Sequence, residues 1–385
     1  MLNKINFLTA GESHGKGLLG IIEGIPSGLA ISHQYIDFHL SRRQKGFGRG
    51  DRMKIEKDQA EMYCGIRLGH TIGAPIGLII KNLDWTNWKD IMSTDANNQN
   101  LEKITLPRPG HADLAGIMKH DFDDIRNVIE RSSARETTMR VALGSVCRKL
   151  LEEFNIYIGS YVSSIYTTKD ETKYSNICPI KINQIADKSP VRSLNKSKEK
   201  KMISIISDAK KNGDSVGGSF CVHVTGVPYG LGSYITWQDK LNARLGEAIL
   251  SINGIKSFSI GDGINSENKL GSQLHDEIAY KNNQFQRLSN NCGGIEGGMS
   301  NGQRIIISAT MKPIPTLIKP LRSIDIKTKE EKLAHKERTD SCSVPAASII
   351  GESMACIVIC DAILEKFGGD SLEQLKAHIK QTAKY

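Results

Sequence analysis

Two distant parts of the chain carry the same short motifs in the same order, and this internal repeat constrains the fold more than any other feature. The first part contains a Gly-Glu-Ser tripeptide that ends at Ser13, and Pro26 follows 13 positions later. The second part contains a Gly-Asp-Ser tripeptide that ends at Ser215, and Pro228 again follows 13 positions later. The equal spacing of matched turn residues favours a duplicated unit over glycines and prolines that recur by chance.

A second pair of matched motifs extends the repeat toward the C-terminus. Glu130-Arg131 corresponds to Glu337-Arg338, and an apolar helical run follows each pair. We therefore predict a single domain over 1–385, made of two similar halves at about 1–160 and 202–370. The Lys-, Ser- and Asn-rich segment at about 170–201 is predicted to connect the halves.

Composition excludes several classes of protein and favours anionic ligands. The net charge of +9 favours partners such as nucleic acid, acidic lipid or small phosphorylated and carboxylated molecules. The longest apolar stretch, 346–364, is interrupted by Glu352 and Asp361, so we predict no membrane-spanning segment. The beginning of the sequence lacks a long apolar signal region, and the eight cysteines form no CxxC pair. We expect a cytoplasmic enzyme without disulfides and without a metal site.

The segment 42–57 (RRQKGFGRGDRMKIEK) carries a net charge of +5 and three glycines, which predicts a flexible basic loop. Charge alone favours a solvated loop or one that contacts RNA. The alternative is a lid whose guanidinium groups bind a multiply charged ligand. Aromatic side chains, on which unpaired bases stack, make up only 6% of the chain, and this argues against an RNA-binding protein.

The segment 106–113 (LPRPGHAD) presents a histidine on a stiff turn. Its two prolines restrict the backbone, and Gly110 permits an unusual backbone angle directly before His111. A single histidine is more often structural than catalytic. A histidine held on such a turn beside Arg108 and Asp113 is a better candidate for proton transfer than most.

The segment 130–137 (ERSSARET) predicts an anion site at the start of a helix. Ser133 and Glu136 form a capping box before an apolar helical run, which places Ser132 and Ser133 at the helix N-terminus. Free backbone N–H groups there, with Arg131 and Arg135 beside them, would bind phosphate or carboxylate. An ordinary capped helix with surface arginines is the alternative, but capping requires neither arginine.

The segment 312–316 (KPIPT) follows a predicted strand, and its two prolines fix an extended edge that could lie along a flat ligand. Asp340 precedes Pro345, which suits the first turn of the next helix. The chain contains no GxxxxGK[ST], GxGxxG or HExxH motif, so P-loop, Rossmann and zincin proteins lack sequence support.

Taken together, these motifs resemble those of the chorismate synthase family from end to end. The matching strings are GESHG (11–15), RRQKGFGRGDRMKIE (42–56), RPGHAD (108–113), ERSSARETTMRVA (130–142), GDSVGG (213–218), SING (251–254), MKPIPT (311–316) and ERTDSCSVPAAS (337–348). The resemblance implies an α+β fold, a β-α-β sandwich with helices packed between two antiparallel sheets. It also implies internal duplication with pseudo-two-fold symmetry and assembly into a homotetramer.

The resemblance implies a lyase of the shikimate pathway, which supplies the aromatic amino acids. Members convert 5-enolpyruvylshikimate 3-phosphate to chorismate and phosphate by an anti-1,4-elimination, the last common step of that pathway. The reaction requires reduced FMN without net redox change, and NADPH is a candidate reductant for the flavin. A flavin-dependent oxidoreductase is the alternative. Neither nucleic acid nor a membrane is expected as a partner.

The resemblance also implies roles for individual residues. His14 matches the histidine that protonates the leaving phosphate, and His111 matches the one that keeps reduced flavin in its productive protonation state. Asp340 matches the aspartate that relays the C6 proton of the substrate through the flavin. Ser13 and Ser133 would assist by hydrogen bonding.

Two further sets of residues are implied as ligand contacts. The flavin contacts are Arg131, Ser132, Ser133, Asn253, Gly254, Gly297, Lys312, Pro313, Ile314, Pro315, Thr316 and Arg338. The residues implied for substrate or NADPH are Arg43 and Arg49, with Arg42 and Arg52 behind them, and Arg135.

Overall fold

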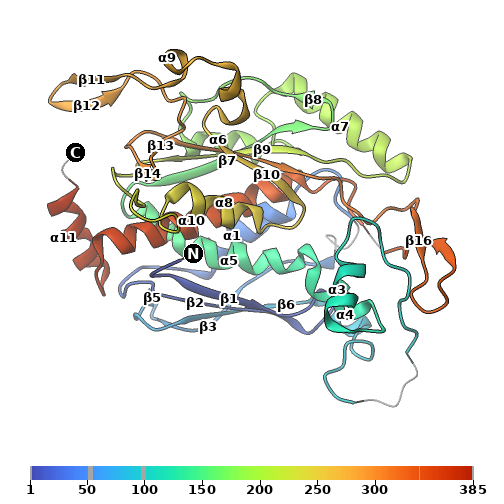
Figure 1. Cartoon of the computed structure of the whole chain (residues 1–385). Helices are drawn as coiled ribbons and strands as arrows, with labels where there is room; N and C mark the ends of the chain where they lie inside the picture. Colours follow the sequence, from blue (N-terminus) through green and yellow to red (C-terminus); the bar gives the residue numbers. More distant parts are fainter. Residues whose placement is uncertain (1, 51–54, 97–100, 338, 384–385) are drawn as a thin grey trace.

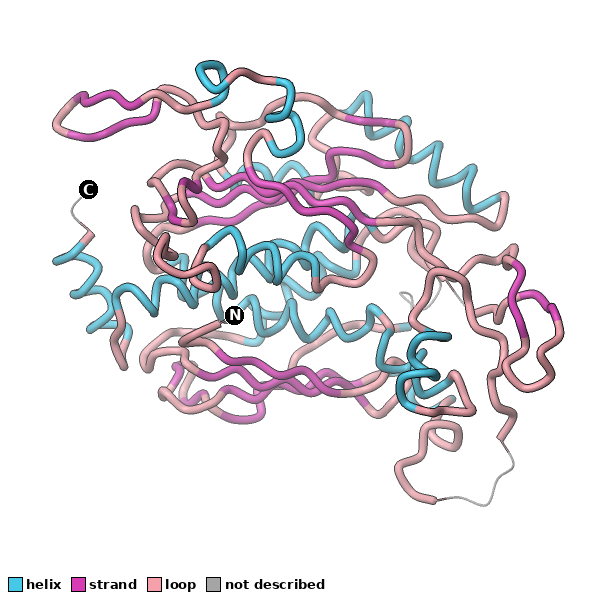
Figure 2. Tube along the Cα trace, in the orientation of Figure 1, coloured by secondary structure: helices cyan, strands magenta, loops and turns pink. Residues whose placement is uncertain are grey.

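In the computed structural model, which describes residues 2–50, 55–96, 101–337 and 339–383, two antiparallel sheets enclose a layer of helices (Figures 1 and 2). This arrangement confirms the predicted α+β sandwich. The first sheet contains β1 (Asn6–Ala10), β2 (Gly17–Glu23), β6 (Ile76–Lys81) and β3 (Glu61–Cys64), in that spatial order. Along β2, Leu18 and Ile22 are buried against the helices while Leu19 and Ile21 are exposed, as a sheet with one covered face requires.

The second sheet repeats the order of the first. It contains β10 (Ile255–Ile260), β15 (Ile305–Met311), β9 (Gly218–Thr225), β7 (Tyr157–Ile165) and the short β8 (Thr168–Lys169). The four long strands of the second sheet correspond, in chain order, to those of the first: β7 to β1, β9 to β2, β10 to β3 and β15 to β6. In both sheets the spatial order across the sheet is first, second, fourth and third strand of the set. Two copies of one strand arrangement therefore face each other across the helices.

Each half contributes two helices to the layer between the sheets. The first half supplies α1 (His33–Gln44) and α5 (Thr137–Glu152), and the second supplies α8 (Leu241–Leu250) and α10 (Val344–Phe367). Helix α10 packs against α5, β7 and β9, so it lies at the centre of the core. In the described part of the chain α10 alone has the length and apolar composition to cross a membrane, and its apolar window is entirely buried in the protein.

The connector between the halves is folded. It contains α6 (Pro179–Ala186) and leads into α7 (Lys196–Lys211), and α6 packs on β7 (Figure 1). The remaining elements are β4 (Ile66–Arg67), β5 (His70–Thr71), η1 (Leu83–Asn87), α3 (Asp113–His120), α4 (Arg126–Ser132), η2 (Ala134–Glu136), η3 (Gly263–Asn268), α9 (Gly271–Leu274), β11 (Ile278–Lys281), β12 (Gln284–Arg287), β13 (Ile295–Glu296), β14 (Met299–Ser300), β16 (Arg322–Ile324), β17 (Glu331–Leu333) and α11 (Leu372–Thr382).

Candidate active site

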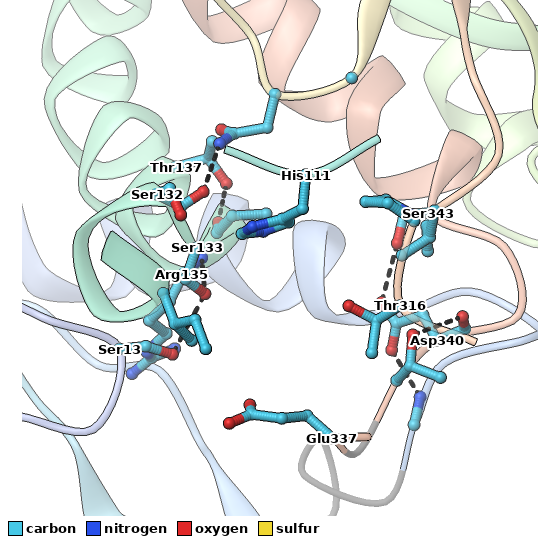
Figure 3. A pocket seen from close by; sticks show the side chains of 18 of the residues that line it. Ser13, His111, Ser132, Ser133, Arg135, Thr137, Thr316, Glu337, Asp340 and Ser343 are labelled. Carbon is cyan, nitrogen blue, oxygen red and sulfur yellow. Dashed lines mark hydrogen bonds between the residues drawn. The ribbon is translucent and has the colours of Figure 1, made fainter. Parts of the chain in front are cut away.

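A cavity of about 720 Å³ lies where the segment from α4 to α5 meets loops of the second half (Figure 3). Its size is typical of a site for a cofactor or a small-molecule substrate. Most of the residues predicted from the sequence line it. They are Ser13, His14, Arg43, Arg49, His111, Ser132, Ser133, Arg135, Asn253, Gly254, Lys312, Pro313, Ile314, Pro315, Thr316 and Asp340.

His14 lies on the turn between β1 and β2 and is only 6% exposed. Its ring nitrogen Nδ1 is 2.9 Å from Oε1 of Glu130, and its backbone N–H donates to Oε2 of the same carboxylate at 2.7 Å. The ring stacks on Trp88, with 3.8 Å between centroids. The Glu130 carboxylate therefore holds both the backbone and the ring of His14.

The turn that carries His14 is held in place by the side chain of Asn82, at the end of β6. Its amide nitrogen donates to three backbone carbonyl oxygens of the turn, those of Glu12, Ser13 and Gly15. The hydroxyl of Ser133 donates to that of Ser13 at 3.1 Å. These bonds place two of the predicted hydroxyl groups side by side at the cavity wall.

The predicted capping box is wrong in detail. Helix α4 ends at Ser132, a 3-10 turn follows, and α5 begins only at Thr137. Ser133 caps the 3-10 turn, since its hydroxyl accepts from the backbone N–H of Arg135. Ser132 donates back to the Val128 carbonyl and terminates the preceding helix. Both serines still line the cavity, because the chain reverses direction there.

His111 is held by the two residues that the sequence placed beside it. Its Nδ1 is 2.5 Å from Oδ1 of Asp113, and Arg108 grips the same carboxylate through Nε at 2.8 Å and Nη2 at 3.0 Å. Burial alone would raise the pKa of Asp113, but hydrogen bonds from His111 and Arg108 hold it well below its usual range. Gly110 has φ +78°, the left-handed conformation expected from the sequence.

Asp340 connects the basic loop to the second half. Its carboxylate accepts from the backbone N–H of Gly50 at 2.6 Å and from the Ser343 hydroxyl at 2.8 Å (Figure 3). Arg49 lies 3.0 Å away through Nη1. These contacts bring Arg49 to the cavity although it is nearly 300 positions from Asp340 in the sequence.

Two buried guanidinium groups form the most cationic wall of the cavity. Asp58 lies between them, accepting from Arg135 Nη1 at 2.5 Å and lying 3.7 Å from Arg43 Nη1. Arg43 Nη1 and Arg135 Nη2 are buried and make no hydrogen bond among the described residues; each reaches a carboxylate only at ion-pair distance, 3.7 Å to Asp58 and 3.6 Å to Glu56. Burial lowers the pKa of Arg43 to about 9, an effect that Arg49 and Arg135 reinforce and Asp58 opposes. An anionic ligand would supply the missing acceptor.

Asn253, Gly254 and the segment 312–316 form another part of the cavity wall. Asn253 donates to the Ser132 carbonyl at 3.0 Å, and the backbone N–H of Lys312 donates to the Gly254 carbonyl at 2.9 Å. Thr316 accepts from Arg108 Nη1 at 2.8 Å. The 312–316 segment lies beside the turn that carries His111, since the Lys312 side chain donates to the Gly110 carbonyl.

Three predicted residues do not line the cavity. Arg42 is buried in a separate ion cluster with Glu352 and Asp187. Arg131 donates to the Thr9 carbonyl at 2.8 Å. Gly297 lies in the turn between β13 and β14, with open space where a Cβ would be. Arg52 and Arg338 lie outside the described residues.

Sequence reasoning missed several side chains at the cavity, among them Trp88, Arg126, His335 and Glu337. Arg126 donates to Oε1 of Glu130 at 3.2 Å and to Oε1 of Glu337 at 2.8 Å. The repeat offered a signal for Glu337, since it is the duplicate of Glu130. Nothing in the sequence around Trp88 or Arg126 marks either as a site residue.

Glu337 gives the fold a pH-dependent contribution. Burial would raise its pKa, but His335 and Arg126 lower it to about 2. A carboxyl group whose pKa is depressed in the folded state stabilises the protein at every pH above its unfolded-state pKa, which is about 4.3 for glutamate. This stabilisation is lost as the pH falls through the folded-state pKa. We expect Glu337→Gln to narrow the difference in urea midpoint between pH 7 and pH 4. The exposed Glu373→Gln variant is the control, and equal pH dependence in both variants would contradict this assignment.

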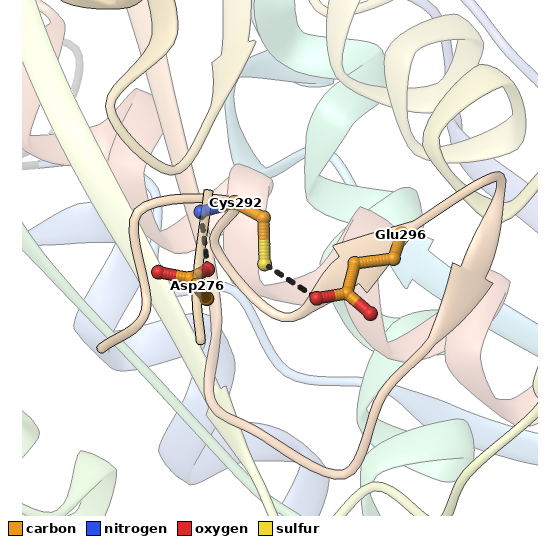
Figure 4. A group of neighbouring side chains, drawn as sticks. All are labelled: Asp276, Cys292 and Glu296. Atoms are coloured by element: carbon orange, nitrogen blue, oxygen red, sulfur yellow. Dashed lines mark hydrogen bonds between the residues drawn. The ribbon is translucent and has the colours of Figure 1, made fainter. Parts of the chain in front are cut away.

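One group of three side chains of metal-ligating type lies outside the cavity in the described part of the chain: Asp276, Cys292 and Glu296 (Figure 4). The Asp276 carboxylate accepts from the backbone N–H groups of Asn291 and Cys292. Glu296 pairs with Arg287, and burial raises the pKa of the Cys292 thiol to about 12. These contacts indicate that the three side chains stabilise the conformation of this loop.

Several known proteins are similar to this chain over almost its whole length. The family model for chorismate synthase matches residues 5–364. The chain is 52% identical to the chorismate synthase of Alkaliphilus metalliredigens over 370 residues, covering 96% of this chain and 97% of the relative. It is 49% identical to that of Aquifex aeolicus, covering 97% and 96%. A crystal structure of chorismate synthase superposes with a TM-score of 0.80 at 37% identity, covering 100% of this chain and 98% of the other. The chain therefore belongs to the chorismate synthase family.

Proposed function

We propose that this cavity is where the chain carries out the reaction of its family, the conversion of 5-enolpyruvylshikimate 3-phosphate to chorismate and phosphate. The substrate carries two carboxylates and a phosphate, and FMN would bring a second phosphate. The observation that carries this assignment is the pair of buried guanidinium groups, Arg43 and Arg135, in which Arg43 Nη1 and Arg135 Nη2 lie near carboxylates but make no hydrogen bond among the described residues. Such groups are completed by a multiply charged anion.

The loop predicted over 42–57 begins only after Gln44, because Arg42 and Arg43 belong to the last turn of α1. Arg43 on this helix and Arg49 in the loop support the lid interpretation over an RNA-contacting loop. Arg43 is 3% exposed, and both Arg43 and Arg49 line the cavity. Arg49 pairs with Asp340 of the second half. Guanidinium groups arranged in this way would bind a ligand inside the cavity.

Residues that would hold FMN are Asn253, Gly254, Ser132 and the segment Lys312 to Thr316. When bound there, reduced FMN would supply transient electron donation without net redox change. We also propose NADPH as a reductant of the flavin. A flavin-dependent oxidoreductase remains the alternative, and it would consume reductant in proportion to product.

The chemistry proposed for the side chains is the one that the family resemblance implies, and their contacts support it. The C–O bond to phosphate breaks, the electron pair leaves with the phosphate oxygen, and Nε2 of His14 gives that oxygen a proton. Asp340 is the carboxylate assigned to the proton lost from C6. His111, held by Asp113 and Arg108, is assigned to keep the cofactor in its productive protonation state.

We further propose a cytoplasmic homotetramer. The outer face of the first sheet supports assembly, because Leu8, Leu19 and Ile21 are between 50% and 69% exposed on it. The β11–β12 hairpin adds exposed Tyr280 and Phe285. Apolar surfaces of this kind commonly mark protein interfaces. Sedimentation velocity would test the stoichiometry.

The assignment is tested by mixing the protein with 5-enolpyruvylshikimate 3-phosphate and dithionite-reduced FMN under nitrogen. Phosphate release and chorismate absorbance are followed together, with oxidised FMN as the control. We expect one phosphate per chorismate, no product with oxidised flavin, and no net flavin oxidation. Flavin oxidation in proportion to product would favour the oxidoreductase. No turnover by folded, flavin-binding protein would reject the lyase assignment.

A further inference from the structure

Glu130 holds the catalytic candidate His14 at two points. The Glu130 carboxylate accepts a hydrogen bond from the His14 backbone N–H at 2.7 Å and lies 2.9 Å from Nδ1 of the His14 ring. The backbone carbonyl of Glu130 also accepts from the Ser13 N–H at 3.0 Å. Glu130 is 2% exposed, so water does not compete for these bonds. The position and the ring orientation of His14 are thus set by the same residue.

The carboxylate that orients His14 is itself fixed from both sides. Arg126, one turn earlier on α4, donates to Glu130 at 3.2 Å and to Glu337 at 2.8 Å. Its guanidinium also lies over the Trp88 ring, 5.1 Å from the centroid, and Trp88 stacks on His14. Arg126 therefore clamps the two duplicated glutamates, one from each half, and supports the ring against which His14 rests.

These contacts keep Glu130 ionised and select one form of the imidazole. Burial would raise the pKa of Glu130, but the hydrogen bond with His14 and the charge of Arg126 lower it. An ionised carboxylate only accepts hydrogen bonds, so the Nδ1 that faces it must carry a proton. A ring that is protonated on Nδ1 gains or loses its other proton at Nε2.

We propose that Glu130 is a positioning residue for His14, which rests on the proposed function of this site. Glu130 keeps a proton on Nδ1, directs Nε2 toward the ligand and balances the charge of the imidazolium before proton transfer. When Nε2 gives its proton to the departing phosphate oxygen, His14 is left as the neutral Nδ1–H form that Glu130 already binds. No proton has to pass to Glu130.

Two conservative variants separate this role from that of a loop anchor. Glu130→Gln keeps the length and shape of the side chain but removes its charge, whereas Glu130→Asp keeps the charge on a shorter stem. A charge-based role predicts that E130Q loses about 100-fold in kcat and E130D about tenfold, with little change in the KM for substrate. An anchoring role predicts the reverse order, because Gln retains the bond from the His14 N–H.

The matched control is Glu136→Gln. Glu136 is also a buried glutamate paired with an arginine, Arg140 at 2.6 Å, and it does not line the cavity. We expect E136Q to keep kcat within about threefold of the parent.

A double variant completes the design: with His14→Ala present, adding E130Q should change kcat by less than about threefold, since the two residues act as a unit. Independent, multiplying losses would overturn the proposal.

A spectroscopic readout tests Glu130 without any turnover. The protein is labelled with ¹⁵N in the histidine rings and sedimented for magic-angle-spinning NMR, and His14→Ala identifies the His14 signals. We expect the parent and E130D to show His14 protonated on Nδ1, and E130Q to show a mixture of forms. An unchanged His14 spectrum in E130Q would overturn the proposal. If H14A instead retained full turnover, the role of His14 in the proposed function would fail, while the spectra would still report whether Glu130 controls the ring.

Discussion

Replacing His14 by alanine is expected to lower kcat by about 10²- to 10⁴-fold, the contribution typical of a positioned general acid. The imidazole lies at the cavity between Trp88 and Glu130, and Ser13 is the other residue of the β1–β2 turn that lines the cavity. Turnover with dithionite-reduced FMN under nitrogen is the measurement. His111→Ala should also lose turnover, since it removes the ring held by Asp113 and Arg108.

Folding must be measured beside turnover for both variants. We expect the thermal midpoint to change far less than the activity, because the ion pairs of Glu130 with Arg126 and of Asp113 with Arg108 remain. His70→Ala is the control: His70 is exposed on β5 and bonds only locally, to the Leu68 carbonyl. If H14A and H111A simply failed to fold, both histidines would be structural and the catalytic assignment would be wrong.

The strand arrangement could be predicted in outline because matched turns enclose equivalent strands. Ser13 and Pro26 lie on either side of β2, and Ser215 and Pro228 lie on either side of β9. Turn residues are chosen by backbone geometry, so a duplicated turn survives where strand sequences diverge. The sandwich itself followed from family resemblance, since periodicity alone does not reveal which faces meet.

The connector shows where composition misleads. Its Lys-, Ser- and Asn-rich composition predicted only a connector, yet α7 begins within it at Lys196 and, beyond its end, buries Met202 and Ile206, four residues apart. That spacing places two side chains on one helical face and was present in the sequence. Surface helices are often as polar as loops, so the apolar spacing is more informative than the charge.

The site could be predicted residue by residue only where a motif carries its own geometry. The Pro/Gly turn before His111 is such a case, because Arg108, His111 and Asp113 are neighbours in sequence and in space. Arg42 and Arg43 show the limit. Successive helical residues point about 100° apart, so Arg43 reaches the cavity while Arg42 turns into the core. Sequence alone cannot tell which of two adjacent arginines faces a ligand.

Arg42 does not line the cavity, but it takes part in a buried ion cluster around Glu352 that stabilises the fold. Glu352 on α10 is fully buried and accepts from both Nη atoms of Arg42, at 2.9 and 3.0 Å. It also accepts from Arg148 at 2.5 Å and Arg192 at 3.2 Å. Burial would raise the pKa of Glu352, but these three arginines hold it far below its usual range. The cluster joins α1, α5, α10 and the connector around one carboxylate.

Glu352→Ala is therefore expected to destabilise the protein by about 3–5 kcal/mol, because it leaves several buried guanidinium groups without their shared counter-charge. Chemical denaturation followed by tryptophan fluorescence measures this. Glu373→Ala is the control: Glu373 is 85% exposed in its side chain and pairs with Lys376, and such pairs contribute about 1 kcal/mol or less. A loss in E352A as small as in E373A would show that the arginines find other acceptors, such as Asp187, which already binds Arg42 and Arg192. A large loss of stability in E352A would show that Glu352 holds the helices of the two halves together. One of these helices is α1, which carries Arg43 at the cavity.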